Sequence, residues 1–463
     1  MSKWLLLLFI SSSLFAQKEI TLEEAILTSL ENNHNLHMAQ YDLEKARQDV
    51  QEAYGYALPR LDLNSSYVRA LQKQELVFNT GDDGFGFFPA DLGRYLGEVS
   101  LATGVTPPNL VGGETQYLNF FNTFRTSVEL NQTLFDYTVL TGIGSSKIYE
   151  KASEEILNSQ YSKTIMNTRQ AYYQTLLAKE AHELMQKSFE NTEARFKEIE
   201  ILFGEGLVSE YDKIRASVQV ENLRPEVTNS KNNFINSLNN LKLIIGLDNN
   251  EIISIKGTFE DFINNKEVPK LEMAFNDVKE NNYDLKALSH QVQVQDAFIE
   301  LYRSEYIPRL SMYANFVSTN LSDDWEFQTI NQSDLGIRLS VNLFSGFQTN
   351  AKVEKAKIDK AKAETQREMI EYSFENQTQD VILRMKNALS QIDASEKNVN
   401  QAQRGYDISN IRYKEGIGSL LELNDSELAL RQAKLNRLQA IFNFLIAKAQ
   451  YENLVGNIEN YNN

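Results

Sequence analysis

An internal duplication is the feature that most constrains the fold of this 463-residue chain. The segment YGYALPRLDLNSSY around Pro59 returns as SEYIPRLSMYANF around Pro308, shifted by 308 − 59 = 249 positions. The same shift aligns Glu31-Asn32-Asn33 with Glu280-Asn281-Asn282. Self-similarity of this kind indicates one structural unit built twice. The sequence therefore divides into a first repeat (17–246), a connector (247–270), a second repeat (271–456) and a short polar tail (457–463).

Each repeat begins with a helix that passes into strands. Pro59 and Pro308 end these helices, because proline lacks a backbone donor and biases the residue before it toward extended structure. Beyond each proline the apolar residues alternate with a period of two, which is typical of a strand with one apolar face. We expect helix-to-strand junctions at Pro59-Arg60 and Pro308-Arg309. The predicted strands cover 124–134, 310–317 and 335–343, with a polar link at 320–324.

The rest of each repeat is predicted to be helical. Residues 137–201 and 348–413 contain no proline, and about 65 helical residues make a rod of about 100 Å. Each rod ends in a glycine-bearing turn, FGEGLVSEYD (203–212) or YKEGIGSLLELND (413–425), and a returning helix follows. Pro225 is expected to kink the first returning helix or to shift its start.

The returning helices are predicted to pack as antiparallel coiled-coil hairpins. In the last helix the apolar residues recur every seven positions, as coiled coils require. The positions in this register are Leu421, Leu428, Leu435, Phe442 and Ala449, with Leu438 and Leu445 between them. Val381, Met385, Ala388 and Ile392 follow the same spacing on the second rod.

The N-terminus and the composition limit the classes of protein. Residues 1–16 form a predicted signal peptide, because the apolar run from Trp4 to Ile10 is shorter than the roughly 20 residues of a spanning helix. The chain has no cysteine, which excludes disulfides, thiolate metal sites and a cysteine lipid anchor. The formal net charge of −17 argues against nucleic acid and anionic lipid headgroups as partners.

The residues give little support to catalysis. His34 and His37 share one helix face and could form a metal pair, but no third ligand is evident in the sequence. No nucleophile elbow, phosphate-binding loop or HExxH motif occurs. We expect no enzymatic activity, no metal and no cofactor.

The alternating strands fit two environments. One is a soluble antiparallel sheet with one face on a core, and the other is a membrane β-barrel with lipid outside and water inside. The signal peptide and strand lengths near 9–11 residues favour the barrel. The segment 73–117, rich in glycine, proline and aromatic residues, is then a long loop on the outer face.

Signal peptide, two copies of helix, strand pair and helical hairpin, and glycine turns together resemble the TolC-like outer membrane efflux proteins. The resemblance covers about Thr21 to Val455, although the chain lacks the cysteine lipid anchor of many relatives and its 73–117 loop is longer than expected. It implies an α+β membrane protein, a homotrimer in which each chain gives four strands to a shared twelve-stranded β-barrel. Long antiparallel helices would continue this barrel as a periplasmic α-barrel.

The resemblance also implies a function and partners. The trimer would be the exit duct of a tripartite efflux pump or a type I secretion system in the outer membrane, with a large periplasmic part. It would work with a periplasmic adaptor and an inner-membrane transporter, and it would contact outer membrane lipid. The alternative is a periplasmic coiled-coil adaptor or adhesin with a soluble β domain. A secreted enzyme would need a convergent polar cluster, and the sequence shows none.

Two sets of residues receive roles through the resemblance. The glycine turns would dock the adaptor, although glycine also serves a tight helix reversal where nothing binds. Acidic residues near the turns would form a pore constriction, although carboxylates are also common on ordinary coiled-coil surfaces. The docking candidates are Gly206, Leu207, Val208, Ser209, Gly416, Ile417, Gly418 and Ser419. The gate candidates are the carboxylates Asp212, Glu422 and Asp425, together with Tyr413, which by the resemblance would help to hold the closed state.

Overall fold

The computed structural model describes residues 18–73, 120–248, 250–263 and 266–457. The predicted signal peptide, nearly all of the 73–117 loop and nearly all of the tail lie outside these ranges. The chain forms two compact units. One comprises Met1–Val50, Gly144–Ile299 and Val353–Asn463, and the other comprises Gln51–Ile143 and Glu300–Lys352. Each unit takes segments from both sequence repeats.

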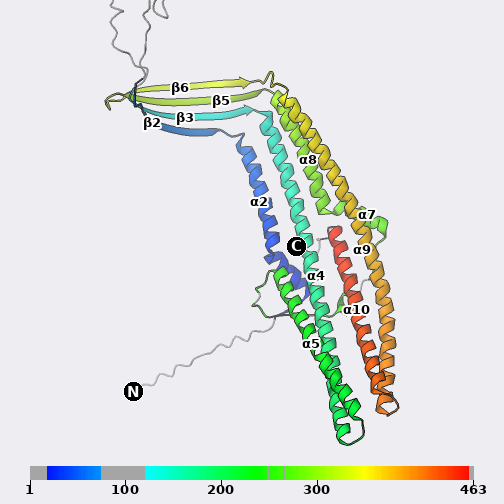
Figure 1. Cartoon of the computed structure of the whole chain (residues 1–463). Helices are drawn as coiled ribbons and strands as arrows, with labels where there is room; N and C mark the ends of the chain where they lie inside the picture. Colours follow the sequence, from blue (N-terminus) through cyan, green and yellow to red (C-terminus); the bar gives the residue numbers. More distant parts are fainter. Residues whose placement is uncertain (1–17, 74–119, 249, 264–265, 458–463) are drawn as a thin grey trace, which may run out of the picture. The chain divides into compact units, whose positions relative to one another are not determined.

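The second unit contains a four-stranded antiparallel sheet (Figure 1). Its order is β2-β3-β5-β6, so the central pair joins the two repeats. The strands are β2 (Arg60–Arg69), β3 (Asn122–Phe135), β5 (Arg309–Ser322) and β6 (Gln328–Ser340). The predicted polar link at 320–324 was too early, because Asn320 still pairs with Thr329. Backbone pairing with β5 thus extends β6 seven positions before the apolar alternation begins at Leu335.

One face of the sheet is apolar and exposed. Leu61, Leu130, Ala314 and Leu335 lie opposite one another across the four strands. Leu61 is 68% exposed and Leu335 is 76% exposed. Since side chains alternate between the two faces, the other face carries the polar residues.

Long helices confirm the predicted rods. Helix α4 (Tyr137–Gly204) has 68 residues and α9 (Gln348–Lys414) has 67. The returning helices are α5 (Glu210–Ile245) and α10 (Leu420–Leu454) (Figure 1). Helix α5 runs through Pro225 and begins directly after the turn, so the proline does not shift its start. The shorter helices are α1 (Leu22–Asn32), α2 (His34–Gly55), α7 (Leu271–Asn281) and α8 (Tyr283–Arg303).

The predicted packing register of α10 is wrong near its start. Leu421 and Leu428 are 43% and 50% exposed, while Leu423 and Leu430 are buried. Further along, the predicted positions Leu438, Leu445 and Ala449 are buried as expected. Helix α10 carries apolar residues on more than one face. Near the turn, the face that is buried within the chain is not the face on which apolar residues recur most regularly every seven positions. On α9 all four predicted positions are buried.

The connector forms a small belt on the first unit. Strand β4 (Ile253–Ile255) pairs in parallel with β1 (Lys18–Ile20), and the short helix α6 (Phe259–Phe262) follows. We call residues 18–20 and 253–262 the belt. Its Ile20 and Phe259 are buried in the same core as Tyr172 of α4. The belt thus covers one side of the long helix.

The duplicated asparagines join helices end to end. Asn33 stands between α1 and α2: its side-chain oxygen accepts from the amide of Leu36 at 3.1 Å, and its side-chain nitrogen donates to the Ile244 carbonyl of α5 at 3.0 Å. In the second repeat, the Asn282 oxygen accepts from the Leu285 amide and its nitrogen donates to the Leu454 carbonyl of α10. We call each arrangement an asparagine joint.

A glycine closes each asparagine joint. Gly246 ends α5 with a φ of +74°, and a Cβ on it would lie 2.6 Å from the Asn32 carbonyl oxygen. Gly456 has a φ of +66°, and its Cβ would lie 2.7 Å from the Asn281 carbonyl oxygen. Both the left-handed backbone and the close approach therefore require glycine.

Gly246→Ala and Gly206→Ala form a matched pair, because both glycines have a φ of +74°. A Cβ on Gly206 would meet no other atom within 4 Å, so Gly206→Ala should cost only the left-handed strain of about 1 kcal/mol. Gly246→Ala must also displace the backbone of Asn32, so we expect a larger drop in melting temperature. Thermal denaturation of the purified protein, followed by circular dichroism, measures both. Equal drops would contradict the role of the close approach.

Candidate functional site

The first glycine turn reverses the chain between α4 and α5. Gly206 has a positive φ, and the amide of Leu207 donates to the Leu202 carbonyl at 2.9 Å. This bond closes a helix end in the manner that favours glycine. Ser209 then caps α5, because its hydroxyl accepts from the Asp212 amide at 3.2 Å and donates to the Asp212 carboxylate at 2.6 Å.

The second glycine turn repeats this geometry between α9 and α10. Gly416 has a φ of +72°, and the amide of Ile417 donates to the Arg412 carbonyl at 3.0 Å. The Ser419 hydroxyl accepts from the Glu422 amide at 3.1 Å and caps α10. The four docking candidates of each turn therefore occupy equivalent places.

The two turns expose apolar side chains. Leu207 and Ile417 are both exposed. Val208 instead packs against a small core of Ile199, Ala216 and Leu420. A Cβ on Gly418 would lie 3.0 Å from the backbone of Tyr413, so this second glycine allows a close approach within the turn.

The gate candidates lie near the turns but do not form one cluster within the chain. Asp212 is half-buried, and Glu422 and Asp425 are exposed in the first turns of α10. The Glu422 carboxylate lies 4.0 Å from the Arg412 guanidinium. In the part of the chain that the structure describes, no hydrogen bond or ion pair joins Asp212 to Glu422 or Asp425.

Among the gate candidates, Tyr413 contacts the small core beside the turns. It packs against Ile199, Ala216 and Leu420. Burial, together with the nearby carboxylates of Glu198 and Asp212, raises the pKa of the Tyr413 phenol. The phenol therefore stays protonated over the physiological pH range and can donate a hydrogen bond there.

Sequence reasoning missed a buried polar network above the turns. Arg195 of α4 donates to the Glu427 carboxylate of α10 at 2.8 Å and to the Asn424 side chain at 3.2 Å. The side chains of the ion pair are only 11% and 12% exposed. Arg431 of α10 donates to the Ser188 hydroxyl of α4 at 3.1 Å. These contacts hold helix α10 against helix α4.

The helix-to-strand junctions also contain charged contacts. Pro59 lies between α2 and β2, and Arg60 pairs with Asp62 at 2.9 Å. In the second repeat a short 3-10 helix, Ser304–Tyr306, precedes Pro308. Arg309 lies 3.7 Å from the Asp136 carboxylate.

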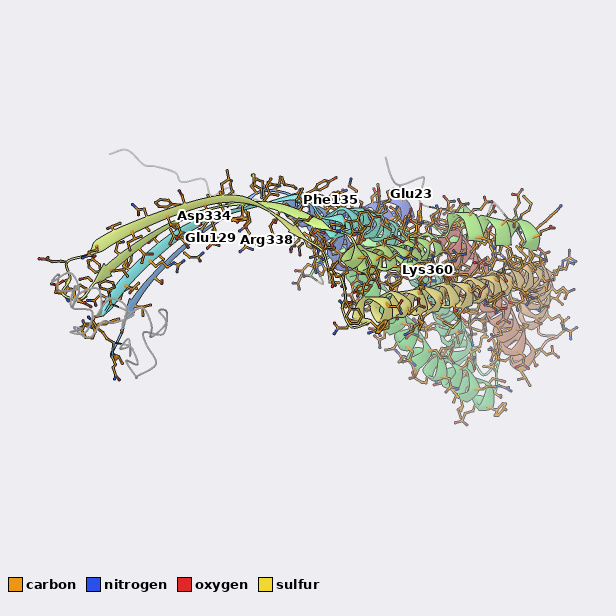
Figure 2. All side chains as sticks on the ribbon, turned by 90° about the horizontal axis from the view of Figure 1, so that it is seen from above. Glu23, Glu129, Phe135, Asp334, Arg338 and Lys360 are labelled. Carbon is orange, nitrogen blue, oxygen red and sulfur yellow. The ribbon has the colours of Figure 1, made fainter. Side chains whose placement is uncertain are left out.

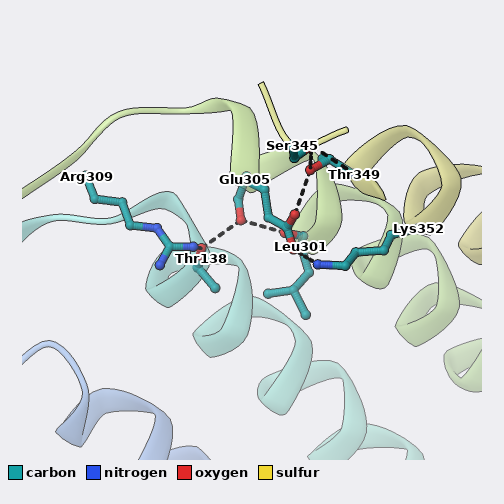
Figure 3. Close-up of polar contacts among 8 residues, drawn as sticks. Thr138, Leu301, Glu305, Arg309, Ser345, Thr349 and Lys352 are labelled. Atoms are coloured by element: carbon teal, nitrogen blue, oxygen red, sulfur yellow. Dashed lines mark hydrogen bonds and ion pairs between the residues drawn. The ribbon is translucent and has the colours of Figure 1, made fainter. Parts of the chain in front are cut away.

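Glu305 forms the centre of the second junction (Figure 3). Its carboxylate accepts from Lys352 at 2.6 Å and from the Thr349 hydroxyl at 2.8 Å. These hydrogen bonds lower the pKa of the Glu305 carboxyl. The 249-residue shift aligns Glu305 with Tyr56, which has no carboxylate. The hydrogen bonds of Glu305 to Lys352 and Thr349 therefore belong to the second repeat.

Acidic residues form a row across the polar face of the sheet. The register places Asp62 opposite Glu129, Glu129 opposite Asn315, and Asn315 opposite Asp334. Figure 2 shows Glu129 and Asp334 along the strands, with Arg338 nearer the strand end marked by Phe135. Only the strand register reveals this row, because its members are far apart in the sequence.

Two further features bear on the expected chemistry. Within the described ranges, no group of three or more His, Asp or Glu side chains is arranged to hold a metal ion. Among the helices of the same ranges, none combines the length and the apolar character needed to cross a bilayer.

Glu427→Gln tests the buried ion pair. Removing one charge leaves Arg195 buried without its counter-ion, which costs about 3 kcal/mol, so we expect a clear drop in melting temperature. Asp425→Asn is the matched control on the same helix, because an exposed substitution changes stability by less than about 0.5 kcal/mol. Limited proteolysis at the turns provides a second measurement. Equal melting temperatures for the two variants would show that the pair contributes little.

Comparisons with solved structures support the fold. The structure of the Campylobacter jejuni CmeC outer membrane channel aligns with a TM-score of 0.73 at 19% sequence identity. The alignment covers 94% of this chain and 85% of that one. The chain therefore has the fold of an outer membrane channel, with long helices and an antiparallel sheet.

Sequence comparisons identify the family. The alkaline protease secretion protein AprF of Pseudomonas aeruginosa is 24% identical over 337 residues, which cover 71% of this chain and 69% of the relative. The outer membrane protein TolC of Escherichia coli is 21% identical over 351 residues, covering 73% and 70%. The family model described as outer membrane efflux protein matches residues 25–247 and 274–457. The chain belongs to the outer membrane efflux protein family.

Proposed function

We propose that three copies of this chain form a passive exit duct from the periplasm to the cell exterior. The four strands of each copy contribute to one twelve-stranded barrel in the outer membrane. The helices continue the barrel as a tunnel in the periplasm. The observation that carries this proposal is the sheet itself, which has an exposed apolar face and, within the described residues, two edges without a neighbouring strand.

The apolar face supports contact with lipid. Leu61, Leu335 and Ile337 are 68%, 76% and 69% exposed. A soluble sheet would bury such a face against a core. This disfavours the alternative of a periplasmic adaptor or adhesin with a soluble β domain.

The sheet edges support assembly. β2 and β6 have one neighbour each in the described chain, and an unpaired strand edge in lipid leaves backbone donors and acceptors unsatisfied. Four strands are too few to close a barrel, since single-chain bacterial barrels have at least about eight. Pairing β6 of one copy with β2 of the next satisfies both edges in a closed ring.

The glycine turns are proposed as the docking site and the gate. Leu207 and Ile417 would contact a periplasmic adaptor, with Gly206, Val208, Ser209, Gly416, Gly418 and Ser419 shaping the turns. Three-fold symmetry would place Asp212, Glu422 and Asp425 in acidic rings, which attract cations at a constriction. Tyr413 would hold the closed arrangement through its packing at the turn.

The proposed duct is passive, so an inner-membrane transporter would supply the energy for export. AprF is named as an alkaline protease secretion protein, which supports protein export. CmeC is described as an outer membrane channel, and the family description is that of efflux. Both kinds of export need the same passive conduit.

Single-channel conductance in a planar bilayer tests the proposal. We expect small, cation-selective openings from the purified wild type. Glu422→Ala/Asp425→Ala should enlarge the openings or reduce the cation selectivity, because it removes negative charge from the constriction. Glu272→Ala removes an exposed carboxylate from the first turn of α7 and should leave the openings unchanged.

The outcomes separate the parts of the proposal. Conductance that is identical in the wild type and the double variant would keep the channel and reject the acidic gate. A folded protein that fails to insert into the bilayer would reject the channel and favour the soluble coiled-coil alternative.

A further inference from the structure

Helix α4 carries neutral amide side chains on the face opposite the belt. Asn167, Gln170 and Gln174 are spaced by three and four residues and therefore share one face of the helix. On the other face, the Tyr172 hydroxyl donates to the carbonyls of Ile20 and Lys256 in the belt. The belt and the amide face are thus on opposite sides of the same helix.

A recess of about 660 Å³ lies on the amide face. It is bounded by α4, α5, α10 and the asparagine joint at Asn33, and Asn35, Asn240 and Gln450 add further amides to its lining. Its volume falls within the range of small-ligand sites. His34 also lines it, but no Asp, Glu, Lys or Arg side chain of the described chain does, although 24% of the chain is charged.

The amides of the recess have unused hydrogen-bonding capacity. The Gln450 side-chain oxygen is buried and has no hydrogen-bond partner in the described chain. The side chains of Gln170, Gln174 and Asn240 likewise make no hydrogen bond to another described residue. Each amide offers two donors and one acceptor oxygen. The recess therefore suits a ligand that is uncharged and that carries both donors and acceptors.

Apolar side chains narrow the ligand class. Leu243, Phe442 and Ile446 line the recess beside the amides, and Leu243 is 73% exposed. An oligosaccharide matches the amides through its hydroxyl groups but has no aliphatic side chains for Leu243. An extended polypeptide supplies both, because peptide groups pair with amides and apolar side chains cover Leu243.

We propose that this recess binds an extended, uncharged stretch of polypeptide during export. The proposal rests on the proposed function and names polypeptide as a cargo class of the duct. We place the belts on the outside of the proposed tube, which leaves its bore open. The amide face then lines the interior, where a passing chain meets it.

The second repeat shows that the amides are not required by the fold. The two glycine turns are related by 416 − 206 = 210 positions, and the glycines of the two asparagine joints by 456 − 246 = 210. The same shift places Gln377, Asp380 and Arg384 at the positions of Asn167, Gln170 and Gln174. Asp380 and Arg384 form an ion pair at 2.8 Å on α9. The long helix therefore tolerates charges at these positions, and the neutral face is specific to the first repeat.

The double variant Gln170→Asp/Gln174→Arg tests the proposal by copying the ion pair of the second repeat into the recess. The probe is a capped peptide of about 12 residues, made of Ser, Gln, Gly and Leu and carrying a neutral dye, a length that spans about 40 Å when extended. Fluorescence anisotropy measures its binding to the full-length protein in detergent. We expect the double variant to bind the peptide at least about tenfold more weakly, because charged side chains resist desolvation by a neutral ligand. Asp380→Gln/Arg384→Gln is the matched control and should bind as the wild type does.

Several outcomes would overturn the inference. These are the absence of peptide binding to the wild type, equal affinity of the wild type and Gln170→Asp/Gln174→Arg, and displacement of the peptide by maltoheptaose as effectively as by unlabelled peptide. Binding is measured without a bilayer, so it is independent of conductance. A protein that conducts without binding the peptide rejects the recess alone, and a protein that binds without inserting rejects the duct alone.

Discussion

The outer strands of the sheet, β2 and β6, each leave one row of backbone N–H and C=O groups without a neighbouring strand in the described chain. In water such an edge is solvated, whereas in lipid each unpaired group costs several kcal/mol. The leucines on one face of the same sheet favour lipid over water. In the proposed trimer both demands would be met together, because each edge would pair with a strand of another copy.

Local periodicity was enough to predict the long helices and the existence of the strands. The rods were predicted to end at 201 and 413, and the structure ends them at Gly204 and Lys414. Both end at glycine turns, whose backbone needs are visible in the sequence. The start of β6 was not predictable in this way, because pairing with β5 rather than apolar alternation decides where the strand begins.

The candidate site was predictable only in part, for a related reason. Glycine and serine at the turns have a backbone role that the sequence reveals, and the capping bonds of Ser209 and Ser419 are local. Arg195 and Glu427 are two charged residues among many on long helices, and only the packing of α10 against α4 brings them together. The choice between Leu423 and Leu421 as the buried residue of α10 depends on tertiary packing in the same way.

The two asparagine joints have a mechanical consequence. Helices α2 and α5 meet at Asn33 without a continuous backbone between them, as α8 and α10 do at Asn282. Each meeting point contains a side-chain hydrogen bond and a closely fitted glycine, while α4 and α9 run past it unbroken. The continuous backbone between a glycine turn and the strands therefore lies in α4 in the first repeat and in α9 in the second. The returning helix of each repeat reaches the next helix only through side-chain and packing contacts, so each repeat has a single covalent path from its turn to its strands.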